Sequence, residues 1–204
     1  VVGGKACMAA DHVVEHPTST GLDNRKLAMW AFLASDCMFF GSLITVYLVS
    51  HGRATVGPYP EEIFDIPFTS VSAFVLLMSS LAMVLALGAL QNGNIARYRI
   101  WIGAVAVLGC IFLGGQIYEF TEFYHEGLTL KSSLFGSSFY VLTGFHGTHV
   151  FVVVVWLMSL LLASFKRGLV TPAKSLNVEM AGLYWHFVDI VWIIIFTVVY
   201  LVEA

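Results

Sequence analysis

The sequence predicts an all-α integral membrane protein, a bundle of five transmembrane helices with the N-terminus inside and the C-terminus outside. Three observations predict this fold. Of the 204 residues, 58% are hydrophobic and only 11% are charged, whereas a soluble domain carries roughly 25% charged residues. Mean hydropathy is +0.84, and the charged residues fall between long apolar stretches. Lysine and arginine also gather on one side of those stretches, which predicts the orientation.

Each predicted span is a mostly apolar run of about 20 residues or more, the length that crosses roughly 30 Å of hydrocarbon. Polar or turn-forming residues separate the runs. Residues 1–25 are polar and are expected to form an N-terminal arm, and residues 26–204 are expected to form a single transmembrane domain. The expected helices cover about residues 27–49, 68–90, 100–120, 139–163 and 181–202.

Eight of the ten lysine and arginine residues share one side of the predicted bundle. The opposite side has only Arg53 and Lys131. Because positively charged loops stay in the cytoplasm, the N-terminus is predicted inside and the C-terminus outside. A formal net charge of −3 argues against nucleic acid as a partner. The eight basic residues are Lys5, Arg25, Lys26, Arg97, Arg99, Lys166, Arg167 and Lys174.

Polar side chains inside the predicted spans are the candidate functional residues, because ionisable groups are costly in hydrocarbon. Asp36 lies near the middle of the first span and is predicted to be a buried acid. Counting inward from the span ends places Asp36 at a depth similar to that of His149, His186 and Asp189 on the last two spans. These four side chains are therefore expected to meet if their helices are neighbours. The other candidates are His146 and His149, His186 and Asp189, each pair three residues apart on one helix, and Gln116 and Glu119 on the third span.

Three interpretations fit these polar residues. They can form a hydrogen-bonded network that ties helices together, a metal or haem site, or a proton path. Spacing favours the network, and the sequence contains no HExxH zinc motif. A stand-alone proton channel or transporter is a further alternative, although no internal repeat and no Pro- or Gly-broken span supports it.

Aromatic residues lie close to several span ends, where they typically form interfacial belts. A cleft that binds lipid is the alternative interpretation. Its candidate residues are Trp30, Tyr184 and Trp185.

Four sequence motifs carry a resemblance to a known family. Residues 27–40 read LAMWAFLASDCMFF, residues 115–120 GQIYEF, residues 139–150 FYVLTGFHGTHV and residues 184–192 YWHFVDIVW. In this order they resemble the S-E-x-M-F-F, Q-x-x-E-[YF], T-G-F-H-G-x-H-V and Y-W-H-F-V-D-x-V-W motifs of subunit III of the haem–copper terminal oxidases, here in the short five-helix bacterial form of cytochrome c oxidase subunit III. The glutamate of the family's first motif is Asp36 in this chain.

The resemblance implies a non-redox subunit of an aa3-type oxidase in the bacterial inner membrane. It implies that this chain holds no haem and no metal, and that haem a, haem a3, CuA and CuB belong to partner subunits I and II. It also implies that the chain binds phospholipid, stabilises the complex and supports sustained proton uptake during O2 reduction. Hydrogen bonding then becomes the favoured role for His146, His149 and His186. Subunit III of a quinol oxidase shares these motifs, and the family also allows membership of a respiratory supercomplex.

Overall fold

Five long helices form the part of the chain that the structure, a computed structural model, describes: residues 23–51, 65–130, 133–166 and 168–201. They are α1 (Asn24–His51), α3 (Ile66–Gln91), α4 (Ile95–His125), α5 (Leu134–Phe165) and α6 (Leu176–Phe196). A short helical turn, η1 (Pro172–Lys174), precedes α6, and a wider turn, η2 (Thr197–Leu201), continues it. The described residues contain no strand, and all five helices are long and apolar enough to cross a membrane. The predicted all-α membrane bundle is therefore confirmed.

The helices extend beyond the apolar runs from which they were predicted. The first four runs lie inside α1, α3, α4 and α5, and the fifth follows α6 and η2 to residue 201. The extensions have a local cause, because polar side chains cap the helix starts by accepting hydrogen bonds from backbone N–H groups. Asp65 accepts from Phe68 N, and Asn94 and Ser133 act in the same way at the starts of α4 and α5. Most of the predicted N-terminal arm, residues 1–22, lies outside the described residues.

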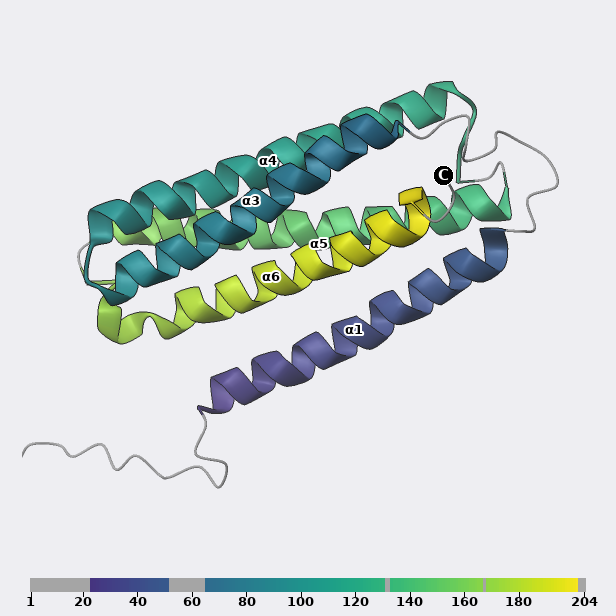
Figure 1. The fold of residues 1–204 in the computed structure, drawn as a ribbon. Coiled ribbons are helices and arrows are strands. Elements are labelled where there is room, and N and C mark those ends of the chain that lie inside the picture. The colour runs from purple at the N-terminus through teal and green to yellow at the C-terminus, as the bar shows by residue number, and fades with distance from the viewer. Residues whose placement is uncertain (1–22, 52–64, 131–132, 167, 202–204) are drawn as a thin grey trace, which may run out of the picture.

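The α3–α4 turn is short because a glycine adopts a backbone conformation that other residues avoid. Gly93 has φ of 75°, the left-handed region where only a residue without Cβ is free of strain. The N–H of Gly93 bonds to Leu90 O at 2.9 Å, and that of Asn94 bonds to Ala89 O at 2.9 Å. These bonds satisfy the last carbonyls of α3 and bring α4 back antiparallel beside it (Figure 1).

Helices α3, α4, α5 and α6 pack around a shared core, and α1 lies at the edge of the bundle against α5 and α6 (Figure 1). Aromatic residues contribute much of this core. Its largest fully buried side chains include Trp185, Trp192, Tyr47, Tyr98, Phe40 and Phe112.

Candidate functional site

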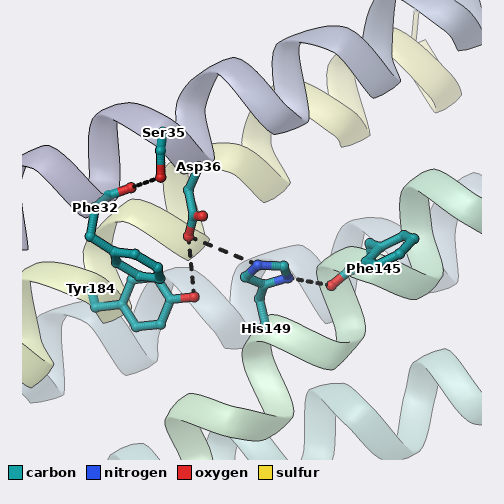
Figure 2. A network of polar contacts seen from close by, with 6 residues as sticks. All are labelled: Phe32, Ser35, Asp36, Phe145, His149 and Tyr184. Carbon is teal, nitrogen blue, oxygen red and sulfur yellow. Dashed lines mark hydrogen bonds and ion pairs between the residues drawn. The ribbon is translucent and has the colours of Figure 1, made fainter.

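Asp36 lies where three helices meet (Figure 2). Its side chain is almost buried, with the residue 8% exposed. The Tyr184 hydroxyl, from α6, donates to Asp36 Oδ2 at 3.4 Å. His149 Nε2, from α5, lies 3.9 Å from the same oxygen. The acid predicted in the first span is therefore placed between a phenol and an imidazole.

The hydrogen bond of His149 to its own helix determines which of its nitrogens carries a proton. His149 Nδ1 is 2.7 Å from the Phe145 carbonyl oxygen of its own helix, and because a carbonyl only accepts, Nδ1 must carry a proton. In a neutral ring, Nε2 then presents a lone pair toward Asp36. The 3.9 Å between Nε2 and Asp36 Oδ2 is longer than a hydrogen bond. The geometry therefore places a carboxyl and an imidazole, two groups that can each bind a proton, next to each other where α1, α5 and α6 meet.

A second polar cluster joins α6 to α3. The Ser80 hydroxyl donates to Asp189 Oδ2 at 2.6 Å, and His186 Nδ1 lies 3.2 Å from Ser80 Oγ. Asp189 Oδ1 is buried and has no hydrogen-bond partner among the described residues. Sequence reasoning missed Ser80, although two consecutive serines in the middle of an otherwise apolar span were a signal that could have identified it.

The expected meeting of all four deep side chains is not what the structure contains. Asp36 approaches His149, whereas His186 and Asp189 share Ser80 instead. The reason is helical geometry: α6 turns about 100° per residue, so Tyr184 and His186 project roughly 200° apart. Once Tyr184 faces Asp36, His186 is turned away from it.

Gln116 and Glu119 tie α4 to two different neighbours. Gln116 Nε2 donates to the Thr143 carbonyl oxygen of α5 at 2.8 Å. The Thr69 hydroxyl of α3 donates to Glu119 Oε1. Both side chains therefore lie in separate helix–helix contacts rather than in the clusters around Asp36 and Ser80.

His146 is enclosed by aromatic rings. It is fully buried and stacks on Trp192, with ring centroids 4.9 Å apart and an interplanar angle of 26°. Phe112 and Phe40 meet its ring edge-on, and neither of its nitrogens has a hydrogen-bond partner in the described part of the chain. His146 therefore contributes packing to this site and joins none of the polar clusters.

The three candidate lipid residues occupy different environments. Trp30 is 58% exposed on α1, while Tyr184 and Trp185 are buried. The Trp185 indole N–H donates to Ser79 Oγ at 3.1 Å. Among these three aromatic residues, only Trp30 offers a lipid an accessible surface.

Loss of the Ser80 hydroxyl should weaken the α3–α6 contact. In Ser80→Ala, both Asp189 oxygens lack a donor, and an unsatisfied buried acceptor costs about 1–3 kcal/mol. We expect the free energy of unfolding, measured by SDS titration in micelles, to fall by that amount. Ser70→Ala is the matched control, because the one hydrogen bond of the Ser70 hydroxyl within the described residues is to Ile66 O of its own helix. Equal stability of the two variants would contradict the assigned role.

The fold and these clusters define the class of the protein: a multi-pass α-helical membrane protein whose buried polar side chains lie mainly at helix–helix contacts. In the described part of the chain, no group of three or more His, Cys, Asp and Glu side chains is placed to hold a metal ion.

Comparison with known proteins identifies the family. The family model for cytochrome c oxidase subunit III matches residues 7–204. Cytochrome c oxidase subunit 3 of Bacillus sp. (strain PS3) is 40% identical over 178 residues, which cover 87% of this chain and 86% of the relative. Quinol oxidase subunit 3 of Bacillus subtilis (strain 168) is 38% identical over 188 residues, covering 92% and 91%. Cytochrome bo(3) ubiquinol oxidase subunit 3 of Pseudomonas aeruginosa is 36% identical over 193 residues, covering 95% and 91%.

The chain belongs to the cytochrome c oxidase subunit III family. It is a subunit III of a haem–copper oxidase, a multi-pass membrane protein of aerobic respiration that functions in a complex with other oxidase subunits. The resemblance carried by the four motifs is confirmed.

Proposed function

We propose that the chain is the non-redox subunit III of an aa3-type cytochrome c oxidase in the inner membrane of a bacterium. Subunits I and II are its partners and carry haem a, haem a3, CuA and CuB. The observation that carries the proposal is the use of the buried polar groups: Asp36, Ser80 and Gln116 each engage a side chain or carbonyl on a neighbouring helix. Such bonds stabilise a membrane bundle that has no hydrophobic force holding its helices together.

The proposed topology has the N-terminus inside and the C-terminus outside, with residues 26–204 as one transmembrane domain. Two contacts support it by gathering basic side chains at one end of the bundle. Lys26 at the start of α1 pairs with Glu179 at the start of α6, with Nζ and Oε1 2.7 Å apart. Arg99 near the start of α4 donates to Ser164 near the end of α5. By the charge rule, this end faces the cytoplasm.

In this proposal Asp36 supports sustained proton uptake, and phospholipid contacts the exposed face of Trp30. Asp36 suits the role because it is a buried acid that lies 3.9 Å from an imidazole. Aspartate is one methylene shorter than the family's glutamate, yet both Tyr184 and His149 approach its carboxyl group.

Removing the exchangeable proton at Asp36 should cause the oxidase to lose its activity after fewer turnovers. Asp36→Asn keeps the size and polarity of the side chain but cannot ionise, so we expect severalfold fewer turnovers before half of the activity is lost. Asp36→Glu keeps the acid and should stay near the wild type. The measurement is O2 consumption by the purified complex over time, with subunit III content checked by gel. Equal lifetimes for Asn and Glu variants would remove Asp36 from the proposal.

The overall proposal is tested by gentle purification of the tagged chain, followed by a visible spectrum and mass spectrometry of the co-eluting chains. Haem a together with subunits I and II, and a subunit II with copper-binding CuA ligands, is the expected result. A subunit II without those ligands would instead indicate a quinol oxidase, the alternative that the nearly equal identities of 40% and 38% support. A colourless product without partners would overturn the oxidase assignment.

A further inference from the structure

Two apolar grooves flank His186 between α1 and α6. One has a volume of about 430 Å³ and is bounded by α1, α3 and α6. The other, of about 390 Å³, lies between α1 and α6 alone. Trp30, Leu183 and His186 line both of them, so the imidazole lies where the two grooves adjoin. Apolar cavities of this size with one or two polar groups are typical of small-molecule sites.

The hydrogen bonds around Ser80 fix what His186 can offer to a ligand. The single hydroxyl proton of Ser80 is donated to Asp189. Ser80 Oγ can then only accept from His186, so the proton of the neutral ring is on Nδ1. The other nitrogen, Nε2, carries a lone pair and has no hydrogen-bond partner among the described residues. The polar group that His186 presents to the grooves is therefore an acceptor, which requires a ligand with an O–H or N–H donor.

The lining of the larger groove favours an aromatic ring. Three methionines, Met29, Met83 and Met180, line it together with Trp30. Thioether sulfur makes favourable contacts with aromatic rings, and methionine side chains adapt to the shape of a flat ligand. The indole of Trp30 adds a surface on which a ring can pack.

Charge argues against an anionic head group in this groove. Lys26 is the only cationic side chain among its described lining residues. Its ammonium group is already 2.7 Å from Glu179 Oε1, a carboxylate that also lines the groove. A phosphate would have to displace Glu179 from Lys26 and would then lie beside an unpaired carboxylate.

We propose that these grooves bind a membrane-soluble hydroquinone. Its phenolic hydroxyl donates to His186 Nε2, and its ring lies in the larger groove among the methionines and Trp30. Its apolar tail passes Leu183 and Trp30, which line both grooves, and extends into the smaller groove. The inference concerns binding only and is independent of which electron donor the complex uses. It extends the proposed function by a site, and because Trp30 lines that site and is also the proposed phospholipid contact, the two ligands compete for this residue.

The test is photolabelling of the complete complex in membranes. The probe is a hydroquinone with a diazirine on its alkyl tail, kept reduced under anaerobic conditions. We expect labelled peptides from 29–37 and 180–190, found by mass spectrometry of this chain. An unlabelled hydroquinone should suppress that labelling about tenfold more effectively than its dimethyl ether, because one hydrogen bond in an apolar site contributes roughly that factor.

Two variants assign the hydroxyl contact to His186. In His186→Leu the hydroquinone and its dimethyl ether should compete equally, while His125→Leu, a control at the exposed end of α4, should keep the tenfold preference. Labelling elsewhere in the chain, or equal competition by the ether in the wild type, would overturn the proposal without reference to any variant. So would stronger suppression by phosphatidylglycerol than by hydroquinone, which would make phospholipid the occupant. A failed oxidase purification with intact labelling would overturn the proposed function and leave this site standing.

Discussion

Replacing Trp185 with alanine is expected to lower the free energy of unfolding by about 3–5 kcal/mol, the range for truncating a large buried aromatic residue. Trp185 is 1% exposed and is one of two tryptophans in the described core. Its ring packs over Gly109 of α4, and its N–H donates to Ser79 of α3. The substitution would therefore leave a cavity where α3, α4 and α6 meet and would remove a polar contact between two of these helices.

Trp101→Ala is the matched control for this prediction. Trp101 is 36% exposed near the start of α4, so its loss leaves no enclosed cavity, and we expect a change of less than about 1 kcal/mol. SDS titration or thermal unfolding of the two purified variants compares them directly. A similar loss of stability in both would mean that Trp185 does not serve as the central packing residue.

A leucine at Gly109 should be nearly as damaging. A Cβ at this position would lie 2.8 Å from Trp185 Cη2 and 2.8 Å from Val154 Cγ2. Neither neighbour is the end of a flexible chain, so α4 would have to move away from α5 and α6. Overpacking of a tight core costs about 1–3 kcal/mol and sometimes more, and a whole leucine side chain places Gly109→Leu at about 3 kcal/mol.

The control lies five residues further along the same helix. A Cβ at Gly114 has nothing within 4 Å, and leucine is a better helix former than glycine by up to about 1 kcal/mol. Gly114→Leu should therefore be neutral or slightly stabilising under the same SDS titration. If both variants behaved alike, close approach at Gly109 would not be what holds these three helices together.

The fold was largely predictable because hydropathy and length report membrane spans directly. What the apolar runs could not report was where each helix begins. Asp65, Asn94 and Ser133 start their helices by capping them, and such residues lie outside any apolar window. Hydropathy reports the length of the apolar run that crosses the hydrocarbon, whereas a cap depends on one side chain and one backbone N–H.

The residues of the candidate site could be predicted better than the contacts between them. Depth along the helices was enough to predict that Asp36 lies near His149. Tyr184 was expected near a span end, in an interfacial belt or a lipid cleft, and Ser80 was not among the candidates, yet these residues supply the hydroxyls that contact Asp36 and Asp189. Depth follows from counting residues along one helix, but partner choice depends on how each helix is rotated about its axis, and a single sequence does not contain that rotation.

The polar contacts between helices have a consequence for the sliding of one helix along another. Two helices that contact each other only through apolar side chains have little preference for one axial position over the next, because the packing energy of leucine on leucine is similar after a shift. Here, a slip of one turn, about 5.4 Å, would separate Ser80 from Asp189 and Gln116 from the Thr143 carbonyl. Lys26 and Glu179 set the same limit for α1. The bundle thus has a defined axial register, in which each of these helices is held at a fixed height relative to its neighbours.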